Sequence, residues 1–202
     1  YGGGVYDNLW AFDKANGVKK WSTKIDTPYG FPAPSIANSM VYVTSGGAGW
    51  SGDLIALNEQ TGAEIWRKSI GTCFGGGSPA IVNSTVHTAS GWTIYAIDAN
   101  TGIEKWSVPA VSADSCEYGA IIAYPFFAVA NGMVFIKSNN LCDVAKVYAV
   151  STANGSLLWD SGPLGDNGAL DGEDSSTPSI ANGWLYFAIG NTLYAYSVLS
   201  LK

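Results

Sequence analysis

The chain has 202 residues, few charged side chains (13%) and a formal net charge of −6. A chain of this length fits one domain with its own hydrophobic core. The negative charge argues against nucleic acid and anionic membranes as partners, because both are bound by basic patches. No apolar run reaches the length of a membrane-spanning helix, so no membrane span is expected.

The first predicted element is a hairpin that carries a Trp in its second strand. Asn16-Gly17 follows Leu9–Asp13, and Trp21 lies ten residues after Ala11. In the copy over 54–66, Ile55, Leu57 and Ile65 alternate with small or polar residues. Alternation of period two predicts strands, and Asn-Gly predicts a tight turn. The same spacing from Ala to Trp recurs at Ala56 and Trp66, at Ala96 and Trp106, and at Ala149 and Trp159; a fifth copy begins at Leu193.

A second type of hairpin precedes each later copy. Pro34–Val43 has its turn at Asn38-Ser39, and related segments turn at Asn83, Asn131 and Asn182. Two hairpins give four antiparallel strands per repeat, with a period that runs from 40 residues between Ala56 and Ala96 to 53 between Ala96 and Ala149. A lone hairpin cannot bury both faces, so the copies must stack. The sequence therefore predicts an all-β fold, a small β-propeller of four-stranded antiparallel blades forming one domain over residues 1–202.

The number of blades stays open between four and five. Complete repeats span 31–70, 77–110 and 117–161, and partial ones span about 1–25 and 176–199, which gives four repeats plus a surplus strand. The chain could form a five-bladed ring with thin blades, a four-bladed ring with an extra strand, or a piece of a larger propeller. In a closed ring the strand over 18–25 could complete the last blade, but the strands around Leu9–Asp13 and Leu193–Ser197 would then compete for one position. An uncovered strand edge would be a site of self-association.

The variable loops are the predicted ligand-binding face. Propeller repeats form a scaffold, and function is carried by loops. The longer loops at one end hold acidic and aromatic side chains without Lys or Arg, which suits a cation, a basic protein or a sugar; the alternative is a solvated acidic rim. The candidate ligand-binding residues are Tyr29, Trp50, Asp53, Phe74, Trp92, Asp114, Glu117 and Asp143.

A calcium site is a further hypothesis for the most acidic loop. Its carboxylates lie among glycines, and hard oxygen ligands of this kind suit Ca²⁺, although their spacing is not that of an EF-hand. The alternative is a long exposed loop. The candidate ligands are Asp166, Asp171, Glu173 and Asp174. No other cofactor is firmly implied.

Cysteine and asparagine positions favour an extracytoplasmic protein, either secreted or periplasmic. Cys116 and Cys142 fall in loops at the same end of one predicted blade, so they either form a disulfide or remain free thiols. The sequences starting at Asn83 and Asn154 are N-glycosylation sequons, although a hairpin turn alone would also explain these asparagines. His87, the one histidine, occupies a strand position that is aromatic in the other repeats, so we expect a structural role and assign no catalytic residue.

The two-hairpin pattern resembles the quinoprotein (PQQ-type) propeller repeat. It reads Ser-Ile-Ala-Asn-Gly, then Leu-Tyr-Ala, then Thr-Gly-x-x-x-Trp. Similar repeats build quinoprotein alcohol dehydrogenases and the assembly factor BamB. The resemblance implies that Trp21, Trp66, Trp106 and Trp159 dock between neighbouring blades. The family's propellers have eight blades, whereas this chain has material for about four, and the adjacent cysteine pair of the quinoprotein enzymes is missing.

The expected function is binding or assembly without catalysis, with a small molecule, a carbohydrate or a protein as the partner. One alternative is a fragment or small relative of a PQQ-dependent dehydrogenase, with PQQ as cofactor. Another is a structural subunit that polymerises through the surplus terminal strand.

Overall fold

The computed structural model describes residues 8–25, 32–46, 52–71, 77–90, 93–109, 126–138, 146–164, 178–189 and 191–198. These residues form strands joined by turns. The strands are β1 (Asn8–Phe12), β2 (Lys19–Lys24), β3 (Ser35–Ala37), β4 (Met40–Gly46), β5 (Gly52–Asn58), β6 (Glu64–Ser69), β7 (Ala80–Val82), β8 (Thr85–Ser90), β9 (Thr93–Asp98), β10 (Glu104–Pro109), β11 (Phe126–Ala130), β12 (Met133–Ser138), β13 (Lys146–Ser151), β14 (Leu157–Asp160), β15 (Ser179–Ala181), β16 (Trp184–Ile189) and β17 (Thr192–Ser197).

The strands form five antiparallel sheets, and within each sheet the strand order follows the chain. Blade 1 is β1–β2, blade 2 is β3–β6, blade 3 is β7–β10, blade 4 is β11–β14 and blade 5 is β15–β17. Blades 2 to 4 confirm the predicted four-stranded unit. Among the described residues, blade 1 holds a third and a fourth strand, and blade 5 holds the first three.

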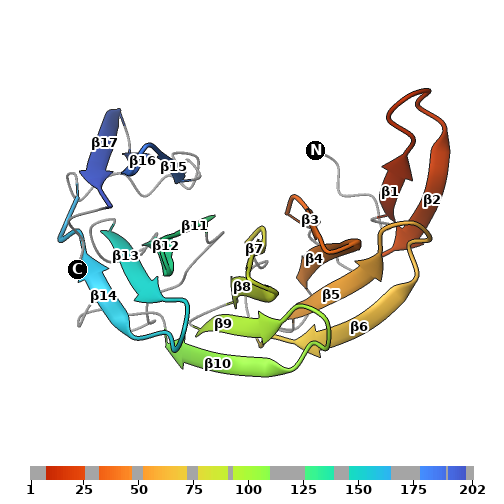
Figure 1. The fold of residues 1–202 in the computed structure, drawn as a ribbon, viewed down its shortest axis with the longest axis horizontal. Coiled ribbons are helices and arrows are strands. Elements are labelled where there is room, and N and C mark those ends of the chain that lie inside the picture. The colour runs from red at the N-terminus through yellow and green to blue at the C-terminus, as the bar shows by residue number, and fades with distance from the viewer. Residues whose placement is uncertain are drawn as a thin grey trace.

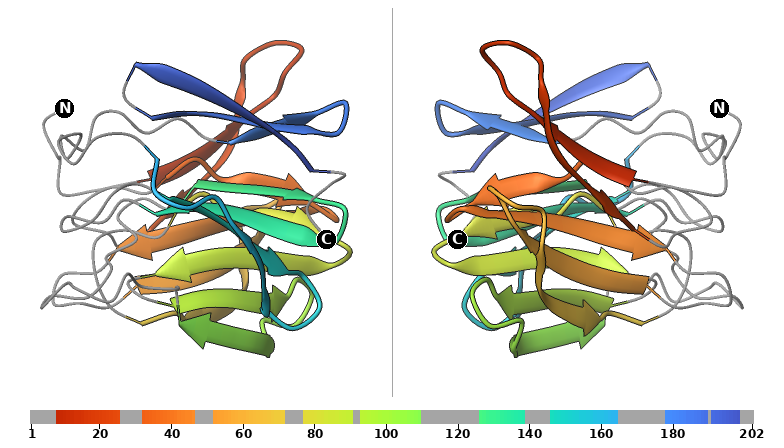
Figure 2. Two further views of the ribbon diagram at one scale, coloured as in Figure 1. Left: turned by 90° about the vertical axis from the view of Figure 1, so that its left-hand side faces the viewer. Right: turned by 90° about the vertical axis from the view of Figure 1, so that its right-hand side faces the viewer.

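The blades stand side by side along an open arc (Figure 1). The short first strands β3, β7, β11 and β15 lie along its inside, where neighbours in this series contact one another, and β6, β10 and β14 lie along its outside. Seen from either side, blades 1 and 5 both lie at the top, on the open side of the arc (Figure 2). The repeats therefore build a β-propeller arrangement that does not close in this structure.

The strand over 18–25 was one candidate to complete the last blade of a ring, and the structure places it elsewhere. The strand β2 pairs with β1, so that Ala11 faces Trp21 in the same register as Ala56 and Trp66 in blade 2. Leu9 and Trp21 are buried against blade 2. Because both strands of blade 1 pack there, β2 is not available to extend blade 5.

Local turn chemistry explains the hairpins. Asn38 and Ser39 have φ values of 52° and 59°, and Asn83 and Ser84 repeat this conformation with 46° and 55°. A two-residue turn in which both residues have positive φ matches the twist of the two strands that it joins. Asn tolerates positive φ better than most residues.

The hydrophobic core lies between blades rather than within them. Each strand presents alternate residues to opposite faces of its blade, so a blade between two others packs against both. In blade 2, Val43 and Ile55 pack toward blade 1, whereas Tyr42 and Leu54 pack toward blade 3. Corresponding clusters lie between blades 3 and 4 and between blades 4 and 5. An end blade therefore has one face without a neighbouring blade in the described part of the chain.

Candidate functional site

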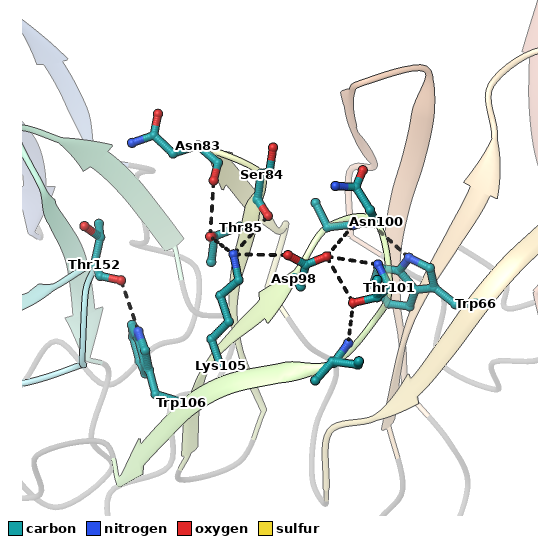
Figure 3. A network of polar contacts seen from close by, with 12 residues as sticks. Trp66, Asn83, Ser84, Thr85, Asp98, Asn100, Thr101, Lys105, Trp106 and Thr152 are labelled. Carbon is teal, nitrogen blue, oxygen red and sulfur yellow. Dashed lines mark hydrogen bonds and ion pairs between the residues drawn. The ribbon is translucent and has the colours of Figure 1, made fainter.

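Neighbouring blades are joined by tryptophans of the fourth strands. The indole Nε1 of Trp21 donates a hydrogen bond to the carbonyl oxygen of Glu59 at 2.9 Å. Trp66 donates to Ala99 at 3.0 Å, and Trp106 donates to Thr152 at 3.0 Å (Figure 3). In each case the acceptor lies in a turn of the next blade. Trp159 contacts the ring of Tyr196 in blade 5, with ring centroids 5.1 Å apart.

A glycine in the next blade provides the surface on which each indole lies. A Cβ atom on Gly62 would stand 2.6 Å from Cε3 of Trp21, and one on Gly102 would stand 2.8 Å from Cε3 of Trp66. Gly17 has the same φ of 72° as Gly62, yet no atom of the described residues lies within 4 Å of its Cβ position. The turn at Gly17 therefore has the form of a Trp acceptor on the face of blade 1 that lacks a neighbour.

The turn that accepts Trp66 is held by a polar network (Figure 3). One oxygen of Asp98 accepts hydrogen bonds from the backbone of Asn100 and Thr101, and the other lies 3.3 Å from Nζ of Lys105. Although partial burial raises the pKa of Asp98, the hydrogen bonds and Lys105 together lower it below its ordinary value. Lys105 also donates to Thr85, at 2.8 Å, so the network ties the two hairpins of blade 3 together.

His87 is a buried aromatic residue in the interface between blades 3 and 4. Its position corresponds to that of Tyr42, whose hydroxyl donates to the carbonyl of Ala99 at 3.1 Å. The imidazole lies 5.7 Å from the ring of Trp106, and neither of its nitrogens has a hydrogen-bond partner among the described residues. Burial, and next the charge of Lys105, lower the pKa of His87 to about 4. At neutral pH the residue is an uncharged packing group.

Most of the loop residues predicted to bind a ligand lie outside the described residues, so their roles stay predictions. This applies to Tyr29, Trp50, Phe74, Trp92, Asp114, Glu117 and Asp143, to the proposed calcium ligands Asp166, Asp171, Glu173 and Asp174, and to Cys116 and Cys142. Asp53 is described: it lies on β5, and its carboxylate is 2.8 Å from Nη1 of Arg67. Within the described ranges, no three His, Cys, Asp or Glu side chains group as metal ligands would.

Both sequon asparagines lie on exposed hairpin turns. Asn83 is the first of the two positive-φ residues before β8, and Asn154 accepts a hydrogen bond from the backbone of Ser156 at 3.0 Å. Exposure is what a glycan requires, so both positions remain candidates for modification.

Sequence reasoning missed the outer face of blade 1, which we call the leading face and define by Trp10 and Phe12. These side chains are 56% and 54% exposed, and their rings contact each other edge to face. Counted from the paired Ala and Trp of each blade, they correspond to Ile55 and Leu57, which are fully buried against the preceding blade. The difference is one of burial, so alignment of the repeats by that pair does not reveal it without the structure.

The opposite end of the arc has a second uncovered face, the trailing face, made of Trp184, Tyr186, Leu193 and Ala195. Ala195 pairs with Tyr186 as Ala56 pairs with Tyr42 in blade 2. Trp184 is 44% exposed and Leu193 is 72% exposed, whereas their counterparts in blade 2, Met40 and Leu54, are buried against blade 3. The trailing face thus consists of positions that cover the next blade elsewhere in the molecule.

Comparison with known proteins identifies the fold. No protein-family model and no curated protein matches the chain. Among solved structures, BamB from Moraxella catarrhalis aligns with 96% of this chain and 53% of its own, at 19% identity and a TM-score of 0.65.

Two quinohemoprotein alcohol dehydrogenases have the same fold over part of their length. ADHIIG from Pseudomonas putida HK5 aligns with 85% of this chain and 33% of its own, at 17% identity and a TM-score of 0.61. The enzyme from Comamonas testosteroni aligns with 96% and 42%, at 18% identity and a TM-score of 0.58. This chain spans about half the length of BamB and less of the dehydrogenases. Its fold is that of the PQQ-type β-propeller repeat, here as an arc of three complete and two partial blades.

Proposed function

We propose that the chain is a non-catalytic assembly module that binds another protein through its leading and trailing faces. One observation carries the proposal: the positions of Trp10 and Phe12 are half exposed in blade 1, whereas the corresponding Ile55 and Leu57 are completely buried in blade 2. The uncovered positions are the same ones that hold the blades together inside the molecule.

The chemistry of these faces favours a protein as the partner. Contiguous exposed apolar side chains mark surfaces that bind proteins, and large aromatic residues contribute most to such binding. Fully burying an aromatic side chain removes roughly 150–250 Å² from water, at about 25 cal/mol per Å², and about half of that area is still exposed on Trp10, Phe12 and Trp184. Trp10, Phe12, Trp184 and Leu193 would therefore supply a useful binding free energy without any polar ligand.

The one histidine gives no support to an acid–base function. His87 is fully buried, and its pKa of about 4 keeps it uncharged near neutral pH. Its contacts are those of a core residue. This favours binding over catalysis as the role of the described part of the chain.

An extracytoplasmic location is part of the proposal, and the exposed turns at Asn83 and Asn154 support it. Mass spectrometry of protein from its source should find glycan at one of these turns or a bond between Cys116 and Cys142. Unmodified turns together with free thiols would contradict this location.

Site-specific photocross-linking in the source cell tests the proposed function. p-Benzoylphenylalanine would be placed at position 12 or 193, with position 103 as the matched control, because Ile103 is also exposed but lies on an outer turn of a complete blade. We expect protein adducts from positions 12 and 193 and not from 103. No adducts at the end faces, or equal yields from all three positions, would overturn the proposal.

A further inference from the structure

We infer that the partner of each end face is a second copy of this chain, so that two arcs join head to tail, the trailing face of one copy against the leading face of the other. The inference rests on the proposed function, since it names the protein that the end faces bind.

The two faces correspond to the two halves of an interface that the molecule already contains. Between blades 2 and 3, Tyr42 and Leu54 contribute one half, and Ile97 contributes to the other. Tyr186 and Leu193 of the trailing face occupy the positions of Tyr42 and Leu54. Phe12 of the leading face occupies the position of Ile97, one residue after the Ala that faces the Trp. Trailing against leading is thus the same kind of contact as blade 2 against blade 3.

Charge disfavours the contact between two leading faces. The segment 8–25, which forms blade 1, carries four lysines and one aspartate, so two such blades would repel each other. The segment 178–198, which forms blade 5, carries no charged residue. A basic blade against an uncharged one has no such penalty, which favours the head-to-tail orientation.

The open shape of the arc allows a pair of copies. The two faces lie at the two ends of an open arc (Figure 1), so one copy can meet the other at both ends. Head-to-tail contacts are heterologous, and such contacts produce a ring when the rotation closes. Two copies related by a twofold axis would form two identical junctions.

Light scattering with face variants tests the inference. The leading variant is Trp10→Glu with Phe12→Glu, the trailing variant is Trp184→Glu with Leu193→Glu, and the control is Ile103→Glu. All five substituted side chains are exposed in the structure, so the variants should fold. Circular dichroism should therefore show an unchanged strand content. We expect the wild type and the control to have twice the chain mass of 21.2 kDa and each face variant to be monomeric.

Mixing the two face variants distinguishes head-to-tail association from a contact between two like faces. In this mixture the leading variant supplies an intact trailing face, and the trailing variant supplies an intact leading face. Head-to-tail association therefore predicts a dimer with one junction. Because the ring gains from its second junction, this dimer should dissociate about 10² to 10⁴ times more readily than the wild type. A monomeric wild type, or a single face variant that still dimerises, would overturn the inference. Adducts of position 12 or 193 with a different protein would also overturn it while supporting the proposed function.

Discussion

Gly62 of blade 2 lies directly against the indole ring of Trp21 in blade 1, where a Cβ atom would stand 2.6 Å from Cε3. The indole Nε1 reaches past this glycine to the carbonyl of Glu59 at 2.9 Å. The repeated Gly and Trp are therefore partners across a blade boundary, since Gly62, Gly102 and Gly155 each lie against the Trp of the preceding blade.

Gly62→Ala should destabilise the protein more than Gly17→Ala. Both glycines have a φ of 72°, so both variants lose about 1 kcal/mol from backbone strain. Only at position 62 does the new methyl overlap an indole, which adds about 1–3 kcal/mol by overpacking. Urea unfolding followed by tryptophan fluorescence measures the difference, and equal midpoints for the two variants would show that the contact with Trp21 is unimportant.

His87→Tyr should stabilise the protein relative to His87→Phe. In blade 2 the hydroxyl of Tyr42 shares the carbonyl of Ala99 with Trp66, and a tyrosine at position 87 would meet the carbonyl of Thr152 in the same way. One such bond contributes about 0.5–1.5 kcal/mol to the free energy of unfolding. Phe provides the same ring without the donor, so identical stability of the two variants would contradict the predicted bond.

Stability should fall as the pH is lowered from about 6.5 to 4, in part because of His87. Burial lowers its pKa from 6.5 to about 4, so the unfolded chain takes up the proton at a higher pH than the folded one. The stabilisation is complete above pH 6.5 and is lost toward pH 4, on the order of 3 kcal/mol in total. Because carboxylates also titrate there, the measurement is the difference between wild type and His87→Phe in urea at pH 7 and 4.5. A loss of stability that is the same in both would contradict this role.

Asp98→Asn should be milder than Asp98→Ala. Asn58 occupies the corresponding place in blade 2, and its side-chain oxygen accepts the same two turn hydrogen bonds, from Gln60 and Thr61. The asparagine variant therefore loses only the partly exposed pair with Lys105, which contributes about 0–1 kcal/mol. The alanine variant loses the turn hydrogen bonds as well. Thermal unfolding gives the order, and equal melting temperatures would argue against the turn network.

Short-range signals in the sequence determine the hairpins and the blades. Asn38-Ser39 and Asn83-Ser84 form the expected turns because their positive φ values depend on residues next to one another. The ten-residue spacing from Ala56 to Trp66 indicates that these two residues pair across one hairpin, and they do pair in the structure. The blade as a unit was predictable for this reason.

The arrangement of the ends was not predictable from those signals. Whether β2 extends blade 5 or stays with β1 depends on the packing of Leu9 and Trp21 against blade 2, which no local pattern encodes. The faces defined by Trp10 and Trp184 emerge only when equivalent positions of different blades are compared for burial. The predicted loop face remains a hypothesis, because apart from Asp53 its residues lie outside the described ranges.

The most direct test of the account is the identity of the peptide that joins position 12 in the purified chain. p-Benzoylphenylalanine would be incorporated there, irradiated in solution, and the adduct sequenced by mass spectrometry after chymotryptic digestion. The account predicts a peptide from a second copy that contains Trp184 or Leu193. A peptide that contains Trp10, one from a complete blade, or no intermolecular adduct would contradict it.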